Sequence, residues 1–184
     1  MEYKHNQIKL LFICVLTLFS GKTISAQQTG SLSKDSVFQF FKTEFVLEAR
    51  VTVGTMIQVG ESKRGVRRII PITGGTFSGP KLKGDILPGG DDWQLVRPDG
   101  DTELYARYLL KTHDGYIIQV INQALIHVDA SDKSFYCKSA PDFEAPSKSP
   151  YDFLNHALFL GTLTIPTLQP GETPYVIIKI FKVL

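Results

Sequence analysis

The side chains best suited to ligand binding or proton transfer alternate along one short stretch, ELYARYLLK. Glu103, Tyr105 and Arg107 are spaced two residues apart, so in a β-strand all three point to the same face. An acid, a phenol and a guanidinium side by side are suited to binding an oxygenated ligand, and burial would shift their pKa values toward those needed for proton transfer. Two placements are open. The polar face is turned to solvent, as on most strands, or it is turned inward to line the cavity of a small barrel.

The segment DILPGGDDWQ brings further functional groups close to this strand. Asp92 and Trp93 come at the start of the predicted partner strand, and Pro98-Asp99-Gly100 has the composition of the hairpin turn between the two strands. In this arrangement Trp93 forms an apolar wall and Asp92 serves as a hydrogen-bond acceptor or base. The alternative is structural: Trp93 belongs to the core and Asp91 caps a turn.

The sequence lacks the spacing that common cofactor and metal sites require. GGTFSGPK resembles a phosphate-binding loop, but Pro80 separates Gly79 from Lys81 and no hydroxyl residue follows. PDGDTE lacks the spacing of a calcium loop, and no serine stands in a Gly-x-Ser-x-Gly elbow. The scattered histidines beyond residue 26 have no metal-ligand spacing. We therefore expect no metal, nucleotide or flavin cofactor.

The first 26 residues have the pattern of a cleavable secretory signal. Lys4 and Lys9 precede the apolar run LLFICVLTLF, and the small residues Ser25 and Ala26 indicate cleavage after Ala26. The run is shorter than the ~20 apolar residues that a membrane anchor needs. We therefore predict a secreted or periplasmic protein with no membrane span after cleavage. Its parts are a signal peptide (1–26), a linker (27–43) and one domain (44–184).

Charge and cysteine content beyond the signal exclude several classes of protein. Removing the signal, with its three lysines and one glutamate, from the 20 basic and 18 acidic residues leaves 17 of each. A neutral domain has no electrostatic footprint for nucleic acid, so we expect no such partner. Cys137 is left without a disulfide partner, and we expect a buried thiol there. The basic segment SKRGVRR is either a solvated hairpin tip or a grip for an acidic ligand: Lys63, Arg64, Arg67 and Arg68.

Hydrophobic alternation with a period of two runs through almost the whole domain and predicts β-strands. It is clearest in FVLEARVTV, where alternate apolar residues from Phe45 to Val53 share one face, and TMIQVG is expected to pair with this strand. Ser149 and Pro150 are suited to the N-cap and first turn of one short helix. Many strands and frequent turns predict an all-β sandwich or barrel. Strands at both ends of the domain would allow the sheet to close into a barrel.

The glycine-rich segments resemble a known family. In this order, IPITGGTFSGPKLKGDILPGGDDWQLVRPDG, YARYLLKTHDGYIIQVIN and YDFLNHALFLGT are similar to the uncharacterised protein family UPF0311, also called domain of unknown function DUF3237. The resemblance extends from Phe45 to Leu184 and implies a single antiparallel, calycin-like β-barrel with at most one or two short helices. Positions that match the family pattern include Gly89, Gly90, Asp92, Trp93, Arg107 and Tyr108.

Three functions are open for such a barrel. The first is binding of a small, partly apolar molecule in a pocket lined by Asp92, Trp93, Tyr105, Arg107 and Tyr108. The second is cofactor-free proton transfer of the isomerase, lyase or cyclase type, with Asp92 or Glu103 as base and Arg107 stabilising a developing oxyanion. The third is a structural envelope protein with a filled barrel. The residues indicate no particular ligand identity or oligomeric state.

Overall fold

Ten β-strands and one short 3-10 helix make up residues 42–184, the part of the chain that the computed structural model describes. The strands are β1 (Thr43–Val53), β2 (Ile57–Ser62), β3 (Gly65–Ser78), β4 (Lys83–Ile86), β5 (Gly90–Val96), β6 (Thr102–Thr112), β7 (Ile117–Val128), β8 (Phe135–Glu144), β9 (Phe159–Thr164) and β10 (Tyr175–Val183). The helix, η1 (Asp152–His156), precedes β9. The predicted signal peptide and the linker up to residue 41 lie outside the described residues. Within residues 42–184, no helix has the length and apolar character needed to cross a membrane.

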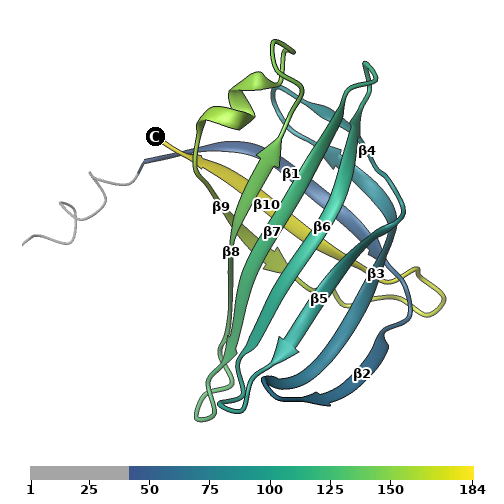
Figure 1. The fold of residues 1–184 in the computed structure, drawn as a ribbon, viewed down its shortest axis with the longest axis vertical. Coiled ribbons are helices and arrows are strands. Elements are labelled where there is room, and N and C mark those ends of the chain that lie inside the picture. The colour runs from purple at the N-terminus through teal and green to yellow at the C-terminus, as the bar shows by residue number, and fades with distance from the viewer. Residues whose placement is uncertain (1–41) are drawn as a thin grey trace, which may run out of the picture.

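The strands form one sheet that closes on itself because β1 has two partners (Figure 1). β1 pairs with β10 along one edge and with β3 along the other. The ring continues from β10 through β9, β8 and β7 to β6. β4 and β5 each pair with both β3 and β6, so together they fill one position. The result is the closed, eight-stranded antiparallel barrel of calycin type that the alternation and the resemblance predicted.

The long strand β3 explains why one predicted pairing is wrong. TMIQVG was expected to pair with the first strand, but β2 pairs with the first half of β3, from Gly65 to Ile69. β1 pairs with the second half of β3, from Ile72 to Ser78. Pro71 lies between the two halves and has no N–H to donate, so the ladder on that side changes partner there.

One half of the barrel interior is filled with side chains. The rings of Phe143 and Phe159 meet edge to face with centroids 4.9 Å apart, and Leu110 and Ile118 are almost fully buried beside them. The helix η1 lies across this end of the barrel and adds the buried Leu154 (Figure 1). The predicted helix is therefore present, but it is a five-residue 3-10 helix rather than one that begins at Pro150.

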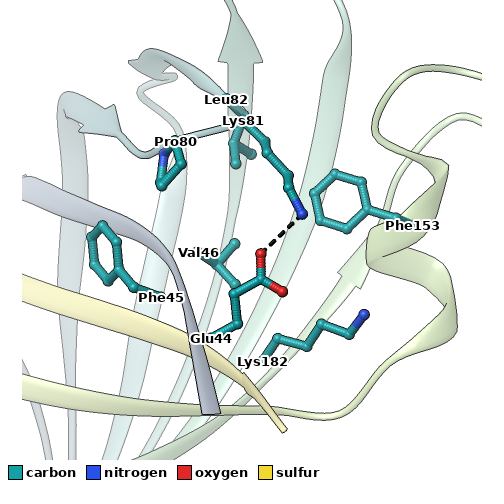
Figure 2. Close-up of a pocket in the computed structure, with 8 residues that line it drawn as sticks. All are labelled: Glu44, Phe45, Val46, Pro80, Lys81, Leu82, Phe153 and Lys182. Carbon is teal, nitrogen blue, oxygen red and sulfur yellow. Dashed lines mark hydrogen bonds and ion pairs between the residues drawn. The ribbon is translucent and has the colours of Figure 1, made fainter. Parts of the chain in front are cut away.

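A small pocket at the filled end is closed by an ion pair. Lys81 Nζ lies 2.9 Å from Glu44 Oε1 and 5.6 Å from the centroid of the Phe153 ring, so its ammonium stands between an acid and an aromatic face (Figure 2). The space left between these side chains is about 10 Å³, close to the minimum for one water molecule. This pocket therefore has no room for an organic ligand.

Candidate functional site

The other half of the barrel interior is hollow. A cavity of about 200 Å³ lies among β1, β3 and β5 to β10. Its lining residues belong to the half of the barrel that ends in the β5–β6 and β7–β8 hairpin turns, which lie at one end of the molecule (Figure 1). It is somewhat larger than the ~150 Å³ cavities that hold benzene. Ile165, which follows β9, lines the cavity and is 63% exposed, so the cavity reaches solvent there. Most lining side chains are aliphatic. The polar ones are Arg68, Asp92, Gln94, Tyr108, Asn122 and Ser139.

The strand register places these polar side chains in two neighbouring rows. Asp92 on β5, Ala106 on β6 and Asn122 on β7 face one another in the first row. In the second row, nearer the hairpin turns, Arg68 and Gln94 are paired at one side and Ser139 lies on β8. Because Ala106 carries only a methyl group, the space between Asp92 and Asn122 stays open.

A chain of hydrogen bonds fixes the orientation of Asp92. Arg68 Nε donates to Gln94 Oε1 at 2.7 Å, and Gln94 Nε2 donates to Asp92 Oδ2 at 2.6 Å. A guanidinium has donors only, so the amide oxygen of Gln94 must face Arg68 and its NH₂ must face Asp92. Oδ2 is thereby held as an acceptor, and Oδ1 is left without a protein partner.

Three residues that line this cavity each have a buried oxygen atom without a hydrogen-bond partner. The atoms are Asp92 Oδ1, Asn122 Oδ1 and Ser139 Oγ, and within residues 42–184 no other buried side-chain nitrogen or oxygen is left unpaired. Buried polar atoms in native proteins are nearly always paired with protein groups or with bound molecules. These three side chains therefore have hydrogen-bonding capacity that the other described residues do not use.

Burial favours the protonated forms of both acids in the cavity. Burial raises the pKa of Asp92, although the hydrogen bond from Gln94, the backbone of Tyr105 and the charge of Arg68 oppose the shift. Burial also raises the pKa of Tyr108, and the charge of Asp92 adds to that effect. The protonated form of Asp92 is thus favoured relative to that of an exposed aspartate.

The predicted inward placement of the polar strand face is wrong. Glu103, Tyr105 and Arg107 lie on the outside of the barrel, where Tyr105 is 44% exposed and Arg107 donates two hydrogen bonds to Gln119 Oε1. The opposite face of β6 turns inward because its residues Leu104, Tyr108 and Leu110 are buried. Of the predicted residues, Asp92 and Tyr108 therefore line the cavity.

Trp93 also lies outside the barrel. It stands directly opposite Tyr105 and is 46% exposed, so it forms no wall of the cavity and no part of the core. With Arg107 it borders an open hollow of about 310 Å³ on the outer surface, beside residues 87–91. The structure thus divides the predicted site into an inner group, Asp92 and Tyr108, and an outer group, Trp93, Tyr105, Arg107 and Glu103.

Comparison with known proteins identifies the family. The profile described as "Protein of unknown function (DUF3237)" matches residues 41–183. The chain belongs to the DUF3237 family. The UPF0311 protein RPA1785 of Rhodopseudomonas palustris is 34% identical over 133 residues, which cover 66% of this chain and 86% of that protein.

Two solved structures extend the comparison. A beta-barrel like protein from Acinetobacter baumannii AYE is 32% identical with a TM-score of 0.69, over 78% of this chain and 96% of that one. A protein from Penicillium herquei described as an enzyme is 25% identical with a TM-score of 0.59, over 78% of this chain and 95% of that one.

The Leu-Pro-Gly-Gly segment of this DUF3237 domain leads directly into the site. Gly89 has a φ of 103°, a backbone conformation that other residues rarely adopt. Gly90 begins β5 against β6, where a Cβ atom would lie 2.7 Å from Tyr108 Cβ and 2.6 Å from the Arg107 carbonyl oxygen. The two glycines therefore allow the chain to turn and then to lie close to β6, two residues before Asp92.

Sequence reasoning missed three polar residues of the cavity, Gln94, Asn122 and Ser139, and named Arg68 only as part of the basic segment. Asn122 had a visible signal, since it interrupts the apolar face of Ile118, Val120, Ala124 and Ile126. Arg68 was grouped with the basic hairpin, but only Lys63 and Arg64 stand at that tip. Within residues 42–184, no group of three or more His, Cys, Asp or Glu side chains is placed to hold a metal ion.

Proposed function

We propose that the hollow half of the barrel binds a small, partly apolar molecule, with Asp92, Asn122 and Ser139 as its polar anchors. The observation that carries the proposal is that three polar residues with an unpaired oxygen gather around one cavity whose other walls are mostly aliphatic. Small-molecule sites have this composition, an apolar lining with a few placed polar groups. Eight-stranded barrels are also wide enough to hold one small ligand.

Native mass spectrometry of the protein purified from its own host tests this proposal. The wild type is expected to carry a bound small molecule. Ala106→Leu, which fills the space between Asp92 and Asn122, is expected to lose it. Trp93→Ala is the matched control, because it changes the outer hollow and leaves the cavity intact. A wild type without any bound mass, or a mass that survives in Ala106→Leu and disappears in Trp93→Ala, would contradict binding inside the barrel.

A second candidate function is cofactor-free proton transfer in the same cavity. Asp92 favours it, because burial raises the pKa of its carboxyl and Oδ1 is free to exchange a proton with a bound molecule. A similar protein from Penicillium herquei is described as an enzyme. In such a reaction Asp92 Oδ1 takes a proton from one carbon or oxygen of the ligand and returns it to another. The predicted roles of Glu103 and Arg107 are not part of this candidate, because both side chains are outside.

Deuterium incorporation tests the proton-transfer candidate. A small-molecule extract of the host is incubated with the protein in D₂O, and the gain of deuterium in individual compounds is followed by mass spectrometry. Asp92→Asn is expected to slow the incorporation at least tenfold, while Glu103→Gln, a carboxyl change on the outer surface, leaves it unchanged. Equal rates in wild type and Asp92→Asn would leave ligand binding as the only function of the cavity.

We also propose that the protein acts outside the cytoplasm, in the periplasm or the medium. The signal pattern of residues 1–26 supports this location. The filled interior that a purely structural envelope protein requires is present only in the half next to η1.

A further inference from the structure

We infer that the cavity takes an uncharged cyclic compound with two hydroxyl groups at opposite ends of its ring, one bound by Asp92 and the other by Asn122. The inference rests on the proposed binding function and specifies the chemistry of the ligand.

The unpaired atoms determine which hydrogen-bonding groups the ligand must carry. Asn122 Oδ1 can only accept a hydrogen bond, and Asp92 Oδ1 is the one oxygen of its carboxyl that Gln94 leaves free. A ligand carbonyl or ether has no hydrogen to donate and would leave Asn122 Oδ1 buried and unpaired, at a cost of about 1–3 kcal/mol. A hydroxyl donates to Asn122. At Asp92 a hydroxyl can donate to the carboxylate or accept from the protonated carboxyl, so it fits either form of the acid.

At the position between Asp92 and Asn122 the surroundings disfavour ionic ligands. An ionised Asp92 would repel a carboxylate placed beside its Oδ1. An ammonium would need the ionised form of Asp92 as its partner, and burial disfavours that form. Burying a charge among aliphatic side chains is costly unless it gains an ion pair.

The strand geometry sets the spacing of the two hydroxyls. Asp92 and Asn122 share a row and are separated by one strand, so their Cα atoms are about 10 Å apart at the usual strand spacing. Both side chains lie on the inner face of the sheet on either side of Ala106, whose methyl group leaves the space between them open. A ring lying over Ala106 with one hydroxyl at each end can form a hydrogen bond with both. Hydroxyls on neighbouring ring atoms would reach only one of the two residues.

The walls and volume limit the size of the ring. Ile70, Ile72 and Ile178 line the cavity, and apart from Tyr108 no aromatic side chain of the described residues lines it. The site therefore offers no aromatic platform for a large planar system. About 200 Å³ holds one substituted six-membered ring, since about 150 Å³ holds benzene.

Four compounds with the same cyclohexane skeleton test separately the effects of a hydrogen-bond donor, a hydrogen-bond acceptor and a charge on the ligand. They are trans-1,4-cyclohexanedimethanol, its dimethyl ether, trans-cyclohexane-1,4-dicarboxylate and trans-1,4-bis(aminomethyl)cyclohexane. Binding to wild type, Asn122→Leu and Ala106→Leu is measured by ligand-observed NMR and calorimetry. The diol is expected to bind at least tenfold more tightly than the other three, a ratio that corresponds to about one hydrogen bond. Asn122→Leu is expected to reduce this preference over the ether at least fivefold, and Ala106→Leu is expected to abolish diol binding.

The outcomes separate this inference from the proposed function. If the ether, the dicarboxylate or the diamine binds wild type as tightly as the diol, and Ala106→Leu removes that binding, the cavity is a ligand site but its ligand is not a diol. The same conclusion follows if Asn122→Leu leaves the preference for the diol unchanged. If none of the four compounds binds and no molecule co-purifies with the wild type, both the inference and the proposed function are wrong.

Discussion

Replacing Asn122 with leucine is expected to stabilise the ligand-free barrel. Asn122 is 5% exposed and its Oδ1 has no hydrogen-bond partner. Its neighbours in the row are Ala106 and Pro141, whose side chains have no polar group. The asparagine therefore buries a polar amide without the bond that would offset the loss of water, and a leucine of similar size fits the same space.

The expected gain follows from the cost of that unpaired amide. Burying a polar group without a hydrogen bond costs about 1–3 kcal/mol, and an apolar side chain of the same shape removes this cost. We therefore expect Asn122→Leu to raise the free energy of unfolding by about 1–2 kcal/mol. For a domain of this size that corresponds to a rise of roughly 3–8 °C in melting temperature.

A second asparagine provides the matched control. Asn155 Oδ1 accepts a hydrogen bond from the Ala145 amide at 2.8 Å, and its Nδ2 donates to the Ala145 carbonyl and to Asp152. Asn155→Leu breaks all of these bonds and is expected to lower the free energy of unfolding by about 1–3 kcal/mol. The same chemical change should thus have opposite signs at the two positions.

Urea denaturation and thermal melting measure both variants. The proteins are first refolded from denaturant, because a ligand that stays bound to the wild type would add to its apparent stability. A loss of more than about 1 kcal/mol in Asn122→Leu, with an unchanged dependence on urea, would refute the reasoning. It would mean that the amide has a structural partner in the folded protein and is not free for a ligand.

Three other predictions test the acid, the cavity wall and the location. Because the pKa of Asp92 is raised in the folded state, its contribution to stability is full below the unfolded pKa and is lost as pH rises through the folded pKa. The melting temperature of Asp92→Asn minus that of wild type should therefore increase as the pH rises above the ordinary aspartate pKa of about 4, whereas a flat difference would place the carboxyl in contact with water. A Cβ at Gly161 would overlap Ser139 Oγ, so Gly161→Ala should lower the free energy of unfolding by about 1–2 kcal/mol and weaken diol binding; unchanged urea midpoints would show that the hydroxyl moves aside freely. Mass spectrometry of the protein from the periplasm or medium of its host should find Gln27 at the N-terminus, and a mature protein that retains residues 1–26 would exclude export by cleavage.

The alternation of the sequence predicted strands and turns well because both depend on local residues. The β5–β6 hairpin turns at Pro98-Asp99-Gly100, where Gly100 N donates to the Arg97 carbonyl, as the turn composition indicated. Alternation also divided β6 correctly into two faces. It could not show which face is inside, because an interior that contains a polar cavity accepts either. The orientation of β6 depends on the other strands, which supply most of the core. Leu104, Tyr108 and Leu110 pack into that core.

A β-bulge in the first strand made the face assignment from hydrophobic alternation wrong for Phe45. The pattern placed Phe45 on the same inner face as Leu47, but the register shifts between these two residues. Phe45 is 38% exposed and packs on the outside against Phe181, while Val46 and Leu47 are both buried. An extra residue in one strand changes the face of every residue before it, and a single strand read alone gives no sign of it.

The adjacent acids Asp91 and Asp92 show how the family motif is connected to the site. Neighbouring residues of a strand point to opposite faces, so Asp91 borders the outer hollow and Asp92 enters the cavity. If β5 were shifted by one residue along β6, Asp92 and its hydrogen-bond partner Gln94 would point outward and Trp93 would point inward. Gly90 opposes that slip, because β5 lies so close to Tyr108 at this point that no residue with a side chain fits there. The glycine thus selects the register in which Asp92 meets Gln94 inside the barrel. The inward position of this carboxyl therefore depends on a residue that has no side chain of its own.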